Sequence, residues 1–392
     1  MKIEPRIAAF HADLTTWRRD IHAHPELGFE ETRTSAVVAE KLKSFGCEVV
    51  TGIAKTGVVG TIRVGNSPRA VGLRADMDCL PMDELNDFEH RSQNKGRMHA
   101  CGHDGHTTML LGAAKYLAET RNFEGAVHFF FQPAEEGGGG GKVMVDEGLF
   151  QKFPCEAVFG MHNRPSVPAG HFAVRGGPQM AAAGMFDIKI TGKGAHGARP
   201  ESGIDPVVVG GHIITALQSI VARNVSPHDT AVISVTQMHA GDAYNVIPES
   251  AVLRGTIRAF KMEVMELMKA NIERISRGIA EGLGAEVEPK VRFSYPPLVN
   301  NHDEARFAAD IAAGIVGEEN VDRNGPMVMA SEDFSYMLNA CPGAFVFIGQ
   351  GGVEGGCEVH NPKYDFNDRI LPLGSTFFAR LVETRLKPAA RD

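Results

Sequence analysis

The sequence predicts an α/β protein whose mostly parallel sheet is interrupted by an inserted, smaller α+β domain. From residue 47 to residue 131, short β-rich segments alternate with helical ones, as in βαβ units. Between residues 185 and 295 the order becomes βαββαβ, which is the order of a ferredoxin-like sandwich. After Tyr295-Pro296-Pro297, which we interpret as a return linker, the C-terminal part resumes the first pattern.

Hydrophobic periodicity predicts the elements of the first part. Apolar residues recur at helical spacing from Ile7 to Trp17, so a helix is expected over residues 6–20. The chain is expected to leave the helical conformation before Pro25, because a proline disfavours helical backbone angles in the residue that precedes it. The other expected helices are 31–45 and 104–119. The expected strands are Cys47–Val50, Val58–Val64, Ala70–Arg74, Ala126–Phe131 and Ala157–Met161.

The same reasoning covers the inserted domain and the C-terminal part. Strands are expected over Met185–Thr191, Thr230–His239, Ala251–Phe260, Ala285–Phe293 and Ala344–Ile348. Helices are expected over 203–223, 261–282, 303–315 and 370–386, with a short one beginning at Ser331. We therefore assign residues 1–184 and 296–392 to one discontinuous domain and residues 185–295 to the inserted one.

Composition excludes several classes of protein. With 392 residues, 43% of them hydrophobic and 22% charged, the chain is an ordinary globular protein of about two domains. Its net charge of -8 and the absence of a basic run argue against binding to nucleic acid. The charged N-terminus does not resemble a signal peptide, and no uninterrupted apolar run of membrane-spanning length occurs. The six cysteines lack framework spacing, so we expect reduced thiols, no membrane association and a cytoplasmic protein.

Metal-ligating side chains gather in one ten-residue stretch and at the ends of predicted strands. Residues 98–107, MHACGHDGHT, contain Cys101 and His103, with a glycine between them that permits a bend. Asp78, the pair Glu135-Glu136 and His162 each follow a predicted strand. Ligands of parallel α/β sheets bind beyond the carboxyl ends of the strands, so these side chains are expected to converge.

Five of these donors suit two metal ions better than one. Cys101, His103, Glu136, His162 and, from the C-terminal part, His360 are too many for one tetrahedral ion with an open position. We expect Cys101 to bridge the two ions. A thiolate among imidazoles favours zinc, cobalt or nickel over magnesium or calcium. Manganese is less favoured by softness, although the availability of metals in the cell can override that preference.

Two acidic residues remain beside the expected ligands. Glu135, next to Glu136, is placed to accept a proton from a metal-activated water and pass it to a leaving nitrogen. Asp78 is expected to hydrogen-bond a ligand imidazole and fix its tautomer. A phosphate-binding loop is excluded at Gly137–Gly141, because Val143 stands where a serine or threonine is needed. Neither His-Glu-x-x-His nor Gly-x-Ser-x-Gly occurs.

Motifs through nearly the whole chain resemble a known family. They are RADMDCLP (74–81), MHACGHDGHT (98–107), FQPAEEG (131–137), GMHNRP (160–165), GKGAHGARP (192–200), NVIP (245–248), GTIRAF (255–260), SEDFS (331–335) and VHNP (359–362). Together they resemble the amidohydrolase branch of the aminoacylase/carboxypeptidase metallopeptidases, which includes hydrolases of hippurate, N-acyl amino acids and indoleacetyl–amino-acid conjugates. The resemblance implies a dinuclear metallohydrolase domain in which Glu135 is the general base.

The resemblance also implies roles for the inserted domain. It would be a lid and a homodimerisation surface, with His196 directed at the carbonyl oxygen of a small-molecule N-acyl amino acid substrate. Asn245 and Arg258 match positions near the substrate. The wider superfamily has a metal-binding histidine where this chain has Asp76, so the role of Asp76 is left open.

Three functions remain to be weighed. The first is a metal-dependent amidohydrolase that cleaves N-acyl amino acids such as hippurate. The second is a dipeptidase or carboxypeptidase that uses the same site. The third, a non-catalytic binding protein on this scaffold, would be marked by the loss of a ligand or of the general base, and neither is missing from the sequence.

Overall fold

The computed structural model describes residues 1–352 and 357–388 and divides the chain into two compact units. Unit 1 contains Met1–Gly177, Val299–Pro326 and Asp333–Asp392, and unit 2 contains Pro178–Leu298 with Met327–Glu332. The sequence places the boundaries at 184/185 and 295/296 instead. The residues just before strand β8 (Ala182–Thr191) belong to unit 2 because their backbone hydrogen bonds lie there: Ala181 N donates to the carbonyl oxygens of Val328 and Ala330, at 3.1 and 3.0 Å.

Unit 1 is built on an eight-stranded sheet with the strand order β1-β2-β4-β3-β5-β16-β6-β15. Its strands are β1 (Glu48–Ile53), β2 (Gly57–Val64), β3 (Ala70–Asp76), β4 (Gly125–Gln132), β5 (Ala157–Arg164), β6 (Phe172–Ala173), β15 (Val321–Asp322) and β16 (Gly343–Gly349). The pairs β4–β3, β3–β5, β5–β16 and β6–β15 are parallel, and the other three are antiparallel. The predicted mostly parallel α/β fold is confirmed.

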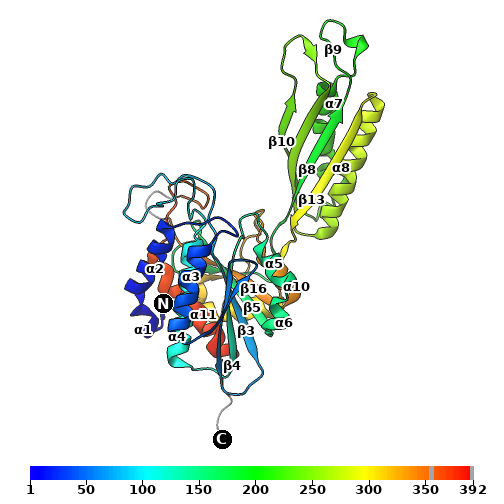
Figure 1. Ribbon diagram of the computed structural model, residues 1–392. Coiled ribbons are helices and arrows are strands. Elements are labelled where there is room, and N and C mark those ends of the chain that lie inside the picture. Colours follow the sequence, from blue (N-terminus) through cyan, green and yellow to red (C-terminus); the bar gives the residue numbers. More distant parts are fainter. Residues whose placement is uncertain (353–356, 389–392) are drawn as a thin grey trace. The chain divides into compact units, whose positions relative to one another are not determined.

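Helices cover both faces of this sheet, which is why β3, β4 and β16 are buried along their whole length. The helices are α1 (Pro5–Ala8), α2 (His11–Ala23), α3 (Thr32–Ser44), α4 (His103–Thr120), α5 (Gly140–Asp146), α6 (Leu149–Lys152), α9 (His302–Val316), α10 (Phe334–Ala340) and α11 (Leu371–Arg385). Figure 1 shows α2, α3, α4 and α11 on one side of the strands and α5, α6 and α10 on the other. The single helix expected over residues 6–20 is wrong, because the chain breaks at Ala9-Phe10 between α1 and α2.

Register brings the carboxyl ends of the central strands to one edge. Asp76, the last residue of β3, pairs with Gln132, the last residue of β4. In the neighbouring parallel pair, Gly349 at the end of β16 lies opposite Arg164 at the end of β5. The residues that follow β3 and β4, and the last residues of β5, therefore start from one edge of the sheet.

Unit 2 has the predicted ferredoxin-like order. Its elements are β8 (Ala182–Thr191), β9 (Ala195–His196), α7 (Pro206–Ser219), β10 (Ala231–Ala240), β11 (Val246–Ile247), β12 (Ser250–Ala259), α8 (Met262–Gly282) and β13 (Glu286–Tyr295). The four long strands pair antiparallel in the order β10-β12-β8-β13, and α7 and α8 pack on them around one apolar core (Figure 1). Strands β7 (Gly177–Met180) and β14 (Leu298–Asn300) lie where the chain passes between the units.

Helix α7 begins at Pro206, and the preceding residue, Asp205, caps it by accepting from Val207 N at 2.8 Å. Together with the π-turn that follows, it spans Pro206–Asn224 with a mean hydropathy of 1.3, so by length and composition it is apolar enough to cross a membrane. One such helix is weak evidence for a span, because core helices pass the same test. Its buried side chains, Val209, Ile213 and Leu217, pack in the core of unit 2.

A buried charge network ties α2 to α4 in unit 1. His22, Asp104 and Arg18 are all 0% exposed. His22 Nδ1 lies 2.8 Å from Asp104 Oδ2, and Arg18 Nη1 lies 3.5 Å from the same oxygen. Burial alone would lower the pKa of His22, but Asp104 and Glu84 raise it to about 9. The charged imidazolium of His22 therefore stabilises the folded state only because carboxylates surround it.

This network predicts a pH-dependent stability. Because the folded pKa of His22 is about 9 and the unfolded value is about 6.5, its contribution is fully present below pH 6.5 and is lost as the pH rises through 9. Between pH 7 and pH 10 the free energy of unfolding should fall in the wild type and fall less in His22→Gln. The difference between the two falls should be on the order of 3 kcal/mol. Urea titrations at both pH values measure this difference. Equal pH slopes in the two proteins would contradict the assignment.

Candidate metal centre

Five side chains that the sequence selects as metal ligands come together at the carboxyl edge of the sheet in unit 1. Sulfur, nitrogen and oxygen donors of Cys101, His103 and His162 lie within 4.8 Å of one another. Donors of Cys101, Glu136 and His360 form a second such group. Cys101 is common to both groups, which is the position expected of a bridging ligand.

The hydrogen bonds of His103 determine which nitrogen faces the other donors. Its Nδ1 lies 2.9 Å from the carbonyl oxygen of Asp78 and 3.3 Å from Asp78 Oδ1. A carbonyl can only accept, so Nδ1 carries the hydrogen and Nε2 presents a lone pair. Nε2 is buried and has no hydrogen-bond partner among the described residues. An orphaned imidazole nitrogen of this kind fits a metal ligand.

Asp78 has a second contact, to the other group of donors. Its Oδ2 accepts the backbone N–H of Glu136 at 2.9 Å. One buried carboxylate thus positions both His103 and Glu136, which arrive from different parts of the sequence. This is the orienting role predicted for Asp78, extended to a second side chain.

His162 is held in the same tautomer as His103. Its Nδ1 lies 2.7 Å from the carbonyl oxygen of Asn163, so Nδ1 donates and Nε2 is left as the acceptor. That Nε2 lies 3.3 Å from Cys101 Sγ. Burial, followed by the neighbouring His106, lowers the pKa of His162 well below its usual range. The imidazole is therefore neutral at physiological pH, as a metal ligand must be.

A backbone hydrogen bond holds His360 at the site. Its N–H donates to the carbonyl oxygen of Ala100 at 2.7 Å, beside Cys101, and its φ of 65° lies in the left-handed region. His360 Nε2 lies 3.2 Å from Glu136 Oε1, although that oxygen makes no well-oriented hydrogen bond to any described residue. A strained backbone that delivers a ligating side chain is typical of functional sites.

Glu135 lies one residue before Glu136 and is 7% exposed. Its carboxylate groups with His103 and Glu136 within 4.8 Å. The residue before it, Ala134, has a φ of 52° and donates its N–H to Glu31 Oε1 at 2.8 Å. The turn directs two consecutive glutamates into the same site, the arrangement required if one binds metal and the other moves a proton.

The charges at the site favour a bound cation. Burial alone would lower the pKa of His103, but Asp76 and Asp78 raise it to about 10, so the surrounding carboxylates attract a positive charge. Burial, then Glu136 and Glu135, raises the pKa of the Cys101 thiol well above its usual range. A thiolate at that position needs a compensating cation, and a metal ion supplies one. The donor set, a thiolate with imidazoles and a carboxylate, fits a borderline-soft divalent ion.

A buried network behind the ligands was not predicted. His106 is held at both nitrogens, by Asp76 Oδ1 and by Asn163 Oδ1, each at 2.7 Å. Asn163 Nδ2 in turn donates to Gln350 and to Tyr364, also at 2.7 Å. The role of Asp76 left open by the sequence is thus to hold His106 and Arg74 by hydrogen bonds. Asp76, His106 and Asn163 lie in three of the motifs noted in the sequence, but nothing in the sequence indicated that they contact one another.

The remaining predicted site residues lie in unit 2. His196 of β9 pairs with Val246 of β11, and Gly197 N donates to Asn245 O at 2.7 Å, so His196 and Asn245 are neighbours. His196 lies at a pocket with a volume of about 870 Å³ that is lined by residues 194–196, 239–243 and 246–250. His196 Nδ1 accepts from Ala198 N at 3.0 Å, which leaves Nε2 as an N–H donor. Arg258, on β12, instead donates to Ser331 Oγ at 2.9 Å.

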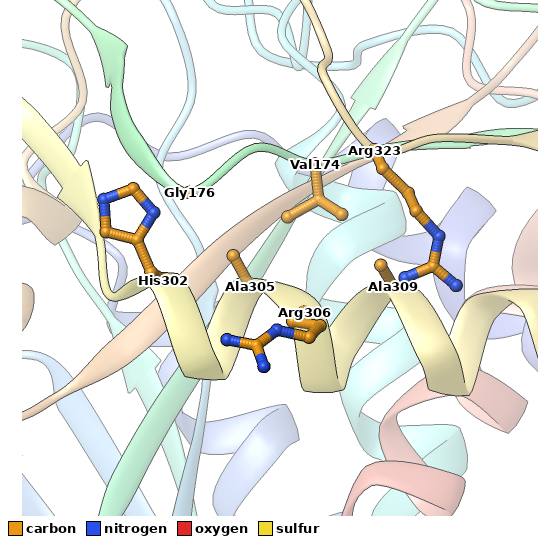
Figure 2. Close-up of a pocket in the computed structure, with 7 residues that line it drawn as sticks. All are labelled: Val174, Gly176, His302, Ala305, Arg306, Ala309 and Arg323. Atoms are coloured by element: carbon orange, nitrogen blue, oxygen red, sulfur yellow. The ribbon is translucent and has the colours of Figure 1, made fainter.

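A smaller pocket of about 210 Å³ in unit 1 is separate from the donors. Figure 2 shows its lining residues, Val174, Gly176, His302, Ala305, Arg306, Ala309 and Arg323. Its two arginines are already paired, Arg306 with Asp303 and Arg323 with Glu318. The pocket therefore has little free positive charge to attract an anionic ligand.

An α/β sheet with this donor set at its carboxyl edge defines a metal-dependent hydrolase. The chain belongs to the peptidase family M20/M25/M40, whose model matches residues 72–384. A hippurate hydrolase from Campylobacter jejuni is 42% identical over 99% of this chain and 100% of its own length. The IAA-amino acid hydrolase ILR1-like 2 from Arabidopsis thaliana is 41% identical over 95% of this chain and 85% of its own length.

A solved structure agrees with these relatives. The crystal structure of a Bacillus subtilis dinuclear metal-binding peptidase of the M20 family superposes with a TM-score of 0.84. That protein is 34% identical and is matched over 97% of this chain and 100% of its own. The protein is therefore a metal-dependent amide hydrolase, and divalent metal ions are its cofactors.

The double contact of Asp78 predicts a loss of metal affinity in Asp78→Asn. In the variant, one of the two carboxylate oxygens is replaced by an NH2 group, which cannot accept a hydrogen bond. Asp78 would then no longer accept from both His103 Nδ1 and the backbone N–H of Glu136, and the orientation of these two residues would be less well fixed. Affinity for the first divalent ion should fall by about 10- to 100-fold, measured by competition with a chromophoric chelator. Asp87→Asn, at an exposed position, is the matched control. Equal affinities in the two variants would contradict the role of Asp78.

Proposed function

We propose that this protein hydrolyses the amide bond between an acyl group and an amino acid, with hippurate-like N-acyl amino acids as substrates. The observation that supports this most is the pair of donor groups that share Cys101, with Glu135 beside them. Relatives named for hydrolysis of hippurate and of IAA–amino acids, each more than 40% identical over nearly the whole chain, support the substrate class.

In this proposal two divalent ions per subunit are held by Cys101, His103, Glu136, His162 and His360. When bound, the ions supply a water of lowered pKa and polarise the amide carbonyl. Manganese, zinc, cobalt and nickel are the candidate metals, and the thiolate favours the last three by softness.

The chain's own residues carry the proton. Glu135 accepts a proton from the attacking water and delivers it to the leaving nitrogen, so the amine leaves as a neutral group. Asp78 keeps His103 in the tautomer whose Nε2 is a ligand. The buried setting of Glu135 limits the access of bulk water to this transfer.

We assign unit 1 to catalysis and unit 2, which contains the predicted insertion 185–295, to a lid that also forms a homodimer. Unit 2 exposes Val207 and Val208 on α7, and Met238 on the edge strand β10. An apolar helix face beside an unpaired strand edge supports self-association. Six free cysteines support a reducing compartment, the cytoplasm.

His196 is proposed to donate from Nε2 to the carbonyl oxygen of the substrate, with Asn245 and Arg258 as further substrate contacts. His196→Ala should lower kcat by about 10²- to 10³-fold while metal content is unchanged. His196→Gln, which keeps an N–H donor, should recover part of the loss. His228→Ala, at another exposed position of unit 2, is the control. A loss of bound metal in His196→Ala would contradict this role.

Replacing the proposed base gives a sharper test. In Glu135→Gln the two ions should remain bound, while turnover of benzoylglycine falls by about 10²- to 10⁴-fold, because the amide cannot accept a proton. Metal is counted by elemental analysis and turnover by release of glycine. Glu89→Gln, on an exposed loop, is the matched control. Retained turnover in Glu135→Gln would refute the assignment.

A dipeptidase or carboxypeptidase activity is the second candidate, favoured by the peptidase of the M20 family that shares 34% identity. Reconstitution with manganese, zinc, cobalt or nickel, followed by a panel of benzoylglycine, N-acetyl amino acids and dipeptides, separates the two. Faster turnover of dipeptides than of acylated amino acids would favour the peptidase activity over the amidohydrolase activity. A purified protein without metal, and inactive with every metal, would instead support a non-catalytic binding function.

A further inference from the structure

Two cysteines that are far apart in the sequence touch in unit 1. The sulfur atoms of Cys155 and Cys341 lie 3.7 Å apart, although the two residues are 186 positions apart in the sequence. Cys341 Sγ also lies 3.5 Å from the carbonyl oxygen of Cys155. Both are free thiols. The sulfurs would need to approach to about 2.05 Å to form a disulfide, a change within reach of side-chain rotation.

The backbone holds this pair in place. Cys155 lies three residues before Val158 and Cys341 two residues before Gly343, and those residues open the parallel ladder of β5 and β16. Val158 N donates to the carbonyl oxygen of Pro342 at 2.9 Å, directly beside the pair. The cysteines are therefore at the amino ends of the same two strands whose carboxyl ends reach the candidate metal centre. They take no part in the proposed reaction.

The two thiols differ in exposure. Cys155 is partly exposed, whereas Cys341 is 5% exposed. The hydrogen bond between the two thiols lowers the pKa of Cys341 and raises that of Cys155. By contrast, burial raises the pKa of both Cys47 and Cys79. A small oxidant can thus reach one member of the pair while the other lies in contact and ready to attack.

We propose that Cys155 and Cys341 form a redox modification site that closes to an intrachain disulfide on reaction with peroxide-type, two-electron oxidants. The site is independent of the metal centre and of the substrate. Its partner is a small oxidant, with hydrogen peroxide as the simplest member of the class.

The chemistry balances in two steps. Cys155 is first oxidised by hydrogen peroxide to a sulfenic acid: the O–O bond breaks, one oxygen is transferred to sulfur and one water leaves. The thiolate of Cys341 then attacks the sulfur of Cys155, the S–O bond breaks, and the hydroxide leaves as a second water with the proton of the Cys341 thiol. Two thiols are oxidised and one peroxide is reduced to two waters.

The disulfide would cross-link the body of unit 1 around the inserted segment. The closed loop runs from residue 155 to residue 341 and includes all of Pro178–Leu298. A cross-link over so long a loop restricts the unfolded chain more than the folded one. The oxidised protein should therefore unfold at a higher temperature and keep its bound metal, since no ligand is consumed.

The test uses metal-loaded full-length protein and stoichiometric hydrogen peroxide. Digestion without reduction should yield one cross-linked pair of peptides, two hydrogens lighter than the free peptides together. Trypsin leaves Cys341 and Cys357 on one peptide, so the digest is repeated on Cys357→Ser to locate the bond. The melting temperature should rise by several degrees and return on treatment with dithiothreitol. Two free thiols per chain should be lost.

Cys155→Ser should show neither the cross-link nor the reversible rise in melting temperature, whereas Cys357→Ser should show both. Conversion of Cys155 to sulfinic or sulfonic acid without the cross-link would overturn the proposal. So would a cross-link that involves Cys357 in place of Cys341. The peptide map of the wild type decides the question by itself if Cys155→Ser does not fold. None of these readouts depends on hydrolytic activity, so they stand or fall separately from the proposed reaction.

Discussion

Strands β4, β3, β5 and β16 run parallel, and their backbone hydrogen bonds bring their carboxyl ends to one edge of the sheet. Asp78 follows β3, Glu135 and Glu136 follow β4, and His162 lies at the end of β5. A slip of one residue in any pair would turn alternate side chains to the opposite face. Both faces of these strands pack against buried residues, so such a slip would disrupt the packing on both faces. The core thereby maintains the distances on which metal binding depends.

Two bends at this edge cost conformational energy. Ala134 and His360 have positive φ values, each disfavoured by roughly 1 kcal/mol or more for a residue with a side chain. Each is held by a backbone hydrogen bond, from Ala134 to the buried Glu31 and from His360 to Ala100. Burial raises the pKa of Glu31, so this carboxylate is itself placed at some cost. The stability of the surrounding core offsets these local penalties.

Residue types and their position after strands predicted much of this site. Cys101, His103 and the adjacent glutamates were identifiable because few combinations of side chains bind soft metals. The ferredoxin-like unit followed from hydrophobic periodicity. By contrast, the antiparallel pairing of β1, β2 and β6 depends on sheet order, which local pattern does not encode. The links from Asp76 through His106 to Asn163, and the contact of Cys155 with Cys341, join residues that only tertiary folding brings together.

The insertion of unit 2 between β5 and β16 also bears on the order in which the chain folds. Val158 pairs with Gly343, so the central sheet is completed only after 184 intervening residues. Within the insertion, Ala183 pairs with Tyr295. Once that ladder forms, only the 24 residues before it and the 47 after it still separate Val158 from Gly343. The entropic cost of closing the remaining loop then falls by about 1 kcal/mol. Early folding of unit 2 would thus make it easier for β5 and β16, two strands of the sheet that carries the candidate metal centre, to pair.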